Sequence, residues 1–261
     1  MVEILDQAVS VRQILSYRTC QARAFAIETG QYQPEIKHRE DLMKSFIGAA
    51  LAGDSAFKRF KEEHKMEIYS SKKPNGLLKD FQIAESIVNV IKEDEFLSNA
   101  FFGEFNVHVS GKIGRAVVES EISYLNAKKG LIIDLALLTG LFNKKFNQEL
   151  NMEVYQVVDD IVNEYAMIAW VNGYLAKTTF NVEFYNYILA LSKEMIPEKE
   201  LISISPNLLA ESKEKFLEIL DTYIKITNGV IDPIACGHCD YCKANKKIQH
   251  SVSVEHLLGW E

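Results

Sequence analysis

Three of the four cysteines in the chain lie within seven positions of one another, near its C-terminal end. They are Cys236, Cys239 and Cys242, and the fourth cysteine, Cys20, belongs to the first part of the chain. Four thiolates are the ligand count of a tetrahedral zinc ion and of a cubane iron–sulfur cluster. In a reducing cytoplasm, clustered cysteines are more often metal ligands or redox groups than structural disulfides. A shared metal would tie the beginning of the chain to its end.

Three histidines are alternative ligands for such a metal. His238 lies between two of the cysteines, and His250 and His256 follow the cluster. His238 could be a ligand in place of a cysteine, and His250 or His256 could complete a zinc site if Cys20 does not reach the cluster. Cys20 would then be a cysteine in a helix that packs as a small hydrophobic residue. The residues by themselves leave these alternatives open.

A second set of candidates is acidic and belongs to predicted strands. The almost wholly apolar segment 131–138 is typical of a central strand covered on both faces, and it carries one charge, Asp134. Glu119 and Glu121 share one face of the preceding strand because side chains alternate along it. Glu104 comes just before the first strand of this group. Converging carboxylates can bind Mg²⁺, which activates water for phosphodiester hydrolysis. Alternatively, Asp134 caps a strand end or accepts a backbone hydrogen bond.

Periodic patterns predict the elements that position these residues. The predicted helices cover about 11–28, 39–52, 54–63, 78–93, 151–172 and 206–228. The first of them is capped by Ser10 and contains Cys20 in its middle. The predicted strands cover about 105–110, 116–124, 131–138, 178–190 and 201–205. This order predicts an α+β fold with an α/β-like core. We expect a single domain over 1–261, with a helical part over 1–100, a sheet core over 101–228 and a cysteine-rich tail over 229–261.

Composition narrows the class of protein. The chain has 261 residues, of which 48% are hydrophobic and 25% charged, as expected for a globular protein with a packed core. Its net charge of −7 argues against a surface that is basic throughout, but not against a local nucleic-acid groove. No apolar run is long enough to span a membrane. The first residues lack the pattern of a signal peptide, which predicts a cytoplasmic protein.

Several segments resemble, in their order along the chain, one known family. The closest likeness is the tail Cys236-Gly237-His238-Cys239-Asp240-Tyr241-Cys242-Lys243. The other similar segments are Ser10 to Ala24 with its Cys-x-Ala-x-Ala, Ile47-Gly48 to Phe57, Gly103-Glu104, Ile132-Ile133-Asp134-Leu135 and Gln156. Together they resemble the phage-type RecE-like (exodeoxyribonuclease VIII-like) exonucleases of the PD-(D/E)XK nuclease superfamily, nearly from end to end.

The resemblance implies a restriction-endonuclease-like mixed sheet flanked by helices. It also implies 5′–3′ degradation of double-strand DNA in recombination, with Mg²⁺ or Mn²⁺ at Asp134 and with Glu104 and Gln156 as further site residues. DNA, a partner protein in phage recombination or replication, and further copies of the chain are the implied partners. Cys20 is the implied fourth ligand of the cysteine cluster. The arrangement resembles the iron–sulfur staple of AddB-type and CRISPR-adaptation nucleases, whose triplet spacing is wider, and the cofactor stays open between a 4Fe–4S cluster and zinc.

The chain departs from the family pattern at the catalytic positions. Ala136 stands where the motif has a lysine, and Ser123 stands where the preceding strand has an acid. The helix at Gly48 offers alanines and a leucine where an acid or histidine is usual. Loss of one electrostatic donor costs on the order of a hundred- to a thousandfold in rate. The sequence therefore predicts a nuclease fold whose centre is inactive or impaired.

The alternative is an active exonuclease whose catalytic residues have migrated. Glu121 would replace the acid lost at Ser123, because both side chains point to the same face of the strand. Lys144 or Lys145 would have to fold back from the next loop to replace the lysine lost at Ala136.

Overall fold

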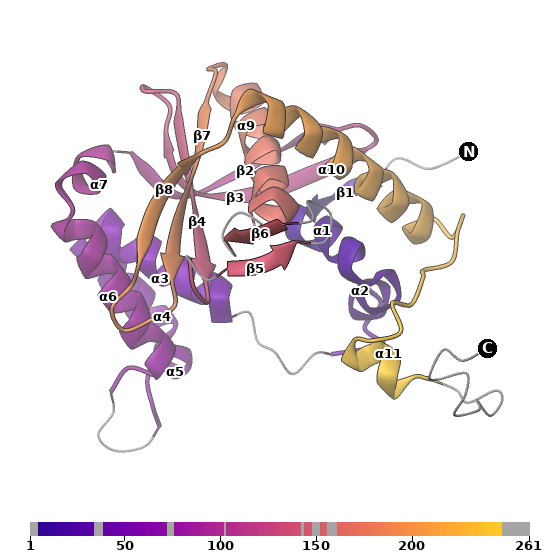
Figure 1. Ribbon diagram of the computed structural model, residues 1–261, viewed down its shortest axis with the longest axis horizontal. Coiled ribbons are helices and arrows are strands. Elements are labelled where there is room, and N and C mark those ends of the chain that lie inside the picture. The colour runs from indigo at the N-terminus through magenta and orange to yellow at the C-terminus, as the bar shows by residue number, and fades with distance from the viewer. Residues whose placement is uncertain are drawn as a thin grey trace.

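A mixed sheet of six strands forms the centre of the protein, whose computed structural model describes residues 5–33, 39–71, 76–101, 103–141, 144–147, 152–155 and 161–246 (Figure 1). The strands are β1 (Leu5–Ser10), β2 (Glu104–Ile113), β3 (Ala116–Asn126), β4 (Leu131–Leu138), β7 (Tyr185–Ser192) and β8 (Lys199–Ser203). Their order is β1-β3-β4-β7-β8, and β2 pairs with β3 as well. Antiparallel and parallel pairs occur together, since β4 runs antiparallel to β3 and parallel to β7.

Strand β3 has two partners on one of its edges, and this arrangement creates the cleft described below. β2 pairs with β3 over nearly its whole length, from Ile113↔Ala116 to Glu104↔Leu125. The other edge is divided between β1, which ends at Ser10↔Glu119, and β4, which begins at Tyr124↔Ile133. The middle of β3 is therefore unpaired on this edge.

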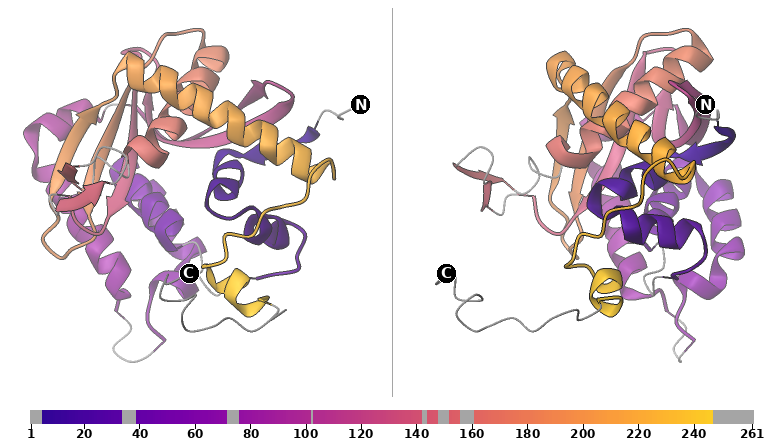
Figure 2. Two further views of the ribbon diagram at one scale, coloured as in Figure 1. Left: turned by 45° about the vertical axis from the view of Figure 1, so that its right-hand side comes forward. Right: turned by 90° about the vertical axis from the view of Figure 1, so that its right-hand side faces the viewer.

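Helices cover both faces of the sheet (Figure 2). One face packs against α1 (Val11–Thr19), α9 (Ala166–Phe180) and α10 (Pro206–Thr227). The other packs against α3 (Arg39–Ala52), α4 (Asp54–Glu63), α5 (Lys65–Ile68), α6 (Lys79–Glu93) and α7 (Glu95–Ala100). Along β4, Ile132 and Ala136 belong to the first core cluster and Ile133 and Leu135 to the second. This double burial confirms the central, doubly covered strand expected from its apolar sequence.

The remaining elements are short. They are α2 (Gln21–Glu28), the pair β5 (Lys144–Asn147) and β6 (Met152–Tyr155), the π-helical turn η1 (Ile161–Tyr165) and α11 (Asp240–Ala244). None of the described helices is long and apolar enough to cross a membrane. The predicted fold class, a mixed sheet flanked by helices, is confirmed.

Two predicted elements are wrong. The helix expected over 151–172 is replaced by strand β6 and, further on, by η1 and α9, which extends to Phe180. The strand expected from residue 178 consequently begins at Tyr185. Threonines and aromatic residues near 180 favour strands, but the burial of α9 against the sheet and α10 outweighs that preference. Asn181, whose φ of 55° is left-handed, then ends the helix.

The first predicted helix is also wrong in one respect, because it is broken at Cys20. This residue is extended (φ −161°, ψ 105°), so α1 ends before it and α2 begins after it. Its sulfur accepts a hydrogen bond from the backbone N–H of Arg23 at 3.5 Å, as a capping side chain does. Because of this break, Cys20 does not follow the helical repeat of α1, and its sulfur lies beside the sulfurs of the C-terminal cysteines.

Candidate active-site cleft and cysteine cluster

A cleft of about 240 Å³ opens where β1 and β4 leave the middle of β3 unpaired. Its walls come from the end of β1 and the start of α1, from β2, β3, β4, α3 and α9, and from Tyr165. The titratable residues that line it, apart from that tyrosine, are Arg12, Asp41, Lys44, His108, Glu119, Glu121 and Asp134. The cleft therefore collects the acids predicted on β3 and β4, together with two cations from helices that precede the sheet.

Asp134 lies in this cleft but is only 4% exposed, and protein N–H groups bond both of its carboxylate oxygens. Oδ1 accepts from the backbone N–H of Ser123 at 3.3 Å, and Oδ2 accepts from the side-chain amide of Asn172 at 2.8 Å. In return, the hydroxyl oxygen of Ser123 accepts from the backbone N–H of Leu135 at 3.2 Å. The side chains of Asp134 and Ser123 thus replace backbone hydrogen bonds that β3 and β4 lose where the two strands separate.

The surroundings of Asp134 favour its neutral form. Burial is the largest effect and raises the pKa of this carboxyl group above its ordinary range. The hydrogen bonds from Asn172 and Ser123 and the charges of Lys44 and Arg12 lower the pKa, but by less than burial raises it. Asn172 is completely buried on α9, and its side-chain oxygen has no hydrogen-bond partner among the described residues.

Ala136, Ser123 and Gly48 mark the places where the chain departs from the family pattern, and the structure shows what surrounds each of them. Ala136 is fully buried in the core between β4 and α9, so its position faces packed apolar side chains. Ser123 bonds the strand backbone as described above. Gly48 allows α3 to approach β2 closely, because a Cβ there would lie 2.5 Å from the side chain of Asn106. Asn106 has a left-handed φ of 53° and lines the cleft opposite Ser123.

Lys44 is a cation of the cleft that the sequence analysis did not identify. It projects from α3, is 8% exposed, and its ammonium lies 5.3 Å from the centre of the Tyr165 ring. Burial first, and the charge of Arg12 second, lower the pKa of Lys44 to about 8, although Glu40 at 3.3 Å opposes both effects. The signal was present in the sequence, because Lys44 interrupts the buried face formed by Met43, Phe46 and Ile47.

The other predicted acids are separated from one another. Glu121 lines the cleft, with its carboxylate 3.9 Å from His108. Glu104 is exposed at the start of β2 and does not line the cleft. Gln156 lies outside the described residues, as do the side chains of Lys144 and Lys145 on β5. Within the described part of the chain, the cysteines are the one group of three or more candidate ligands close enough to hold a metal ion.

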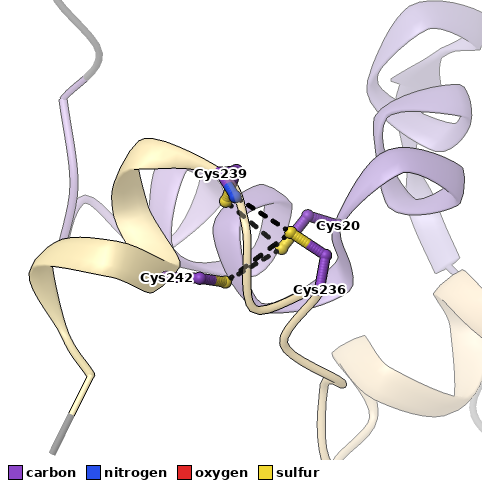
Figure 3. A group of neighbouring side chains, drawn as sticks. All are labelled: Cys20, Cys236, Cys239 and Cys242. Carbon is purple, nitrogen blue, oxygen red and sulfur yellow. Dashed lines mark hydrogen bonds between the residues drawn. The ribbon is translucent and has the colours of Figure 1, made fainter. Parts of the chain in front are cut away.

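The four cysteine sulfurs converge at the junction of α1, α2 and α11 (Figure 3). The sulfur of Cys20 lies 3.5 Å from that of Cys242 and 3.8 Å from that of Cys239, and those of Cys236 and Cys242 are 3.9 Å apart. All four lie within 4.8 Å of one another and could hold a metal ion. Zn–S bonds of about 2.3 Å in a tetrahedron place sulfurs about 3.8 Å apart. A cubane has four irons between its ligands and needs a wider set of sulfurs.

Two backbone N–H groups favour the thiolate form of Cys236. The N–H groups of His238 and Cys239 bond the sulfur of Cys236 and lower its pKa to about 6, which favours the thiolate that metals bind. The backbone N–H of Cys242 acts on Cys239 in the same direction. For Cys239, however, burial and the neighbouring thiols outweigh that donor and raise the pKa to about 11. Thiols this close cannot all ionise without a cation between them.

Contacts outside the sulfurs also hold the tail against the start of the chain. The backbone N–H of Ala22 bonds the carbonyl of Ile234 at 3.1 Å, and the rings of Tyr32 and Tyr241 are 5.2 Å apart. His238 is exposed and its ring contacts its own loop, with Nδ1 2.8 Å from the carbonyl oxygen of Cys236. His250 and His256, the other alternative ligands, lie outside the described residues.

The fold and the cleft define the class of protein as a member of the PD-(D/E)XK nuclease superfamily, as the sequence predicted. Within that class, the chain belongs to the family described as PDDEXK-like domain of unknown function (DUF3799), whose pattern matches residues 10–245.

Solved structures resemble the chain to different degrees, whereas no curated protein matches it. The crystal structure of a putative exonuclease from Eubacterium rectale is 19% identical and has a TM-score of 0.80 over 96% of this chain and 92% of that one. The structure of a phage-related exonuclease from Haemophilus somnus is 9% identical and has a TM-score of 0.36 over 77% of this chain and 99% of that one. At 19% identity the first structure supports the fold alone.

Proposed function

We propose that this protein binds DNA in a phage or prophage setting through a nuclease fold whose own catalytic centre is inactive or strongly impaired. One observation carries the proposal: protein donors bond both oxygens of Asp134, the acid of the motif. The position two residues later is a buried methyl group, Ala136, with no charge to orient water. A divalent ion at such a site would supply a polarised water and neutralise developing charge. Here it would first have to displace the hydrogen bonds that Ser123 of β3 and Asn172 of α9 donate to Asp134.

The proposal predicts that the folded protein does not degrade DNA. Purified protein incubated with linear duplex DNA and either Mg²⁺ or Mn²⁺ should release no nucleotides, while a mobility-shift assay should still detect binding that weakens with salt. A Glu85→Gln variant is a matched control, because it removes an exposed acid of α6 outside the cleft. Digestion of linear DNA that depends on added metal and disappears in Asp134→Ala would contradict the proposal.

The position of Lys44 favours a second candidate function, a metal-dependent exonuclease with migrated residues. In that function Lys44 takes the part of the lysine missing at Ala136, and Glu121 takes that of the acid missing at Ser123. Lys44 lies in the same cleft as Asp134, and its pKa of about 8 suits a proton donor near neutral pH. If digestion is found, Lys44→Ala should reduce its rate on the order of a hundredfold or more. Lys58→Ala, which removes an exposed lysine of α4 outside the cleft, should leave the rate unchanged.

We further propose that the four thiolates hold one metal centre, so that the first and last parts of the chain act as one domain. Two centres have the required four ligands. The sulfur separations fit a single zinc ion more closely, whereas the family resemblance implies a 4Fe–4S cluster. A colourless protein with one zinc per chain identifies the first. Broad visible absorbance with about four irons per chain identifies the second.

The proposed setting is the reducing cytoplasm, where thiolates persist as metal ligands. A partner protein in recombination or replication, and association with further copies of the chain, are consistent with this role. Size-exclusion chromatography with light scattering, with and without DNA, measures both.

A further inference from the structure

A second recess adjoins the cleft and follows the helix pair that leads to the cysteine cluster. It encloses about 790 Å³ and is lined by both α1 and α2, with Glu164 and Met167 on the opposite side. Ser10, Arg12 and Asp41 line both the recess and the cleft, so the two are continuous. A chain-like ligand whose end lies in the cleft would have to pass through or beside this recess.

Three arginines line the recess, and two of them lack a carboxylate partner. Arg12 forms an ion pair with Asp41. Arg18 and Arg23 form no ion pair with any described residue, and Nε of Arg23 is buried without a hydrogen-bond partner in the described part of the chain. A buried guanidinium nitrogen that lacks an acceptor is costly, and a ligand oxygen would satisfy it.

The acids that line the recess do not pair with these two guanidinium groups. The carboxylate of Glu28 accepts hydrogen bonds from the hydroxyl of Tyr17 at 2.5 Å and from that of Tyr223 at 2.8 Å. Asp41 is paired with Arg12, as described. Glu164 is exposed, and no described cation forms an ion pair with it. Arg18 and Arg23 are therefore the cations of the recess that have no anionic partner among the described residues.

The break at Cys20 places these arginines on two helices. Arg18 precedes the break at the end of α1, and Arg23 follows it in the first turn of α2. If the helix were continuous, the two side chains would be five residues apart, on different sides of one cylinder. Because the chain is extended at Cys20, the two helices form the walls of one recess.

We infer that this recess, which we call the arginine recess (Arg12, Arg18 and Arg23), binds the phosphates of one DNA strand and leads that strand past the catalytic cleft. The inference rests on the proposed DNA-binding function. Guanidinium groups bind phosphate oxygens in bidentate fashion, and contacts to phosphate carry no base preference, so binding through them should not depend on sequence. A single strand fits better than a duplex because the charges lie inside a recess and not along an open surface.

The test compares single-strand binding by the wild-type chain and by the double variant Arg18→Ala/Arg23→Ala. Fluorescence anisotropy with an end-labelled oligothymidylate, at several salt concentrations and without added divalent metal, gives the affinity and its salt dependence. We expect about tenfold weaker binding, and a slope of log K against log salt that is shallower by about 1.4, since each lost phosphate contact on a single strand contributes about 0.7. Binding of a blunt duplex should weaken less.

Two control variants separate charge from folding. Arg18→Lys/Arg23→Lys keeps both positive charges and should keep the salt slope close to that of the wild type. Arg59→Ala removes an exposed arginine of α4, outside the recess, and should change neither quantity. Thermal melts of all variants show whether the fold is retained.

Each contrary result has a distinct meaning. If the wild type binds DNA and the double alanine variant binds it equally well, the arginine recess is not the strand path, although the proposed function stands. If the variant weakens duplex and single strand equally, the preference for one strand is wrong. If the wild type binds neither, the proposed DNA-binding function fails together with the recess.

Discussion

Replacing Cys20 with serine is expected to reduce the metal content of the protein and to lower its free energy of unfolding by several kcal/mol. The four sulfurs converge within 4.8 Å, so a metal bound there joins α1 and α2 to the C-terminal tail. Structural zinc sites in small peptides contribute on the order of 10–16 kcal/mol of binding free energy, which couples to folding. A serine oxygen replaces one thiolate poorly as a ligand of zinc or iron.

The measurements are metal analysis, the visible spectrum and thermal unfolding of protein purified without oxygen. His238→Ala is the matched control, because this exposed histidine belongs to the same loop and its side chain bonds only the carbonyl oxygen of Cys236 among the described residues. Cys242→Ser should resemble Cys20→Ser, since both thiols are buried in the cluster. Unchanged metal content and stability in Cys20→Ser would show that the remote cysteine is not a ligand.

Substitutions of Asp134 and Asn172 are expected to change stability in opposite directions. Asn172→Leu removes the amide that bonds Oδ2 of Asp134 at 2.8 Å and leaves a buried carboxylate short of a donor. The expected cost is about 2–3 kcal/mol at neutral pH. Asp134→Asn instead replaces a buried carboxyl group with an uncharged amide of nearly the same shape. The asparagine can still accept from Ser123, and the unpartnered oxygen of Asn172 can receive its amide after a rotation. We expect this variant to be more stable than the wild type by about 1–3 kcal/mol at neutral pH.

The raised pKa of Asp134 determines how the stability difference between Asp134→Asn and the wild type changes with pH. Burial raises the pKa of Asp134 in the folded protein, so between the unfolded and folded pKa values the native state binds more protons than the unfolded state. The contribution of Asp134 to stability is therefore fully present below the unfolded pKa, near 4, and is lost as the pH rises through the folded pKa. The advantage of Asp134→Asn should grow over this window and then level off.

Urea unfolding at a series of pH values, without added divalent metal, measures both variants. Repeating the series with Mg²⁺ or Mn²⁺ addresses function. If either ion stabilises the wild type but not Asp134→Asn, then Asp134 is a metal ligand and the centre is more complete than we propose. A less stable Asp134→Asn variant would show that the carboxylate is needed for the fold in its charged form.

Much of this fold follows from local patterns. The helices α3, α4 and α6 and the hairpin of β2 and β3 lie close to where the sequence patterns place them. β1 and the true extent of α9 could not be predicted in the same way. β1 is an edge strand whose residues find a partner only at the distant Ala116 to Glu119, and α9 carries strand-favouring residues that tertiary packing overrides.

The sequence by itself supplied the candidate ligand set and the proposed defect of the catalytic centre. Four cysteines and a lone aspartate in a buried strand define the candidate chemistry, and Ala136 stands where the motif has a lysine. These inferences need only the identities of the residues. Only the tertiary structure decided which groups meet. Asn172 bonds Asp134 from α9, and Lys44 lines the cleft that forms because β1 and β4 share one edge of β3. Cys20 reaches the C-terminal cysteines because the helix breaks at that residue. Such meetings depend on pairing between distant segments, which no local spacing encodes.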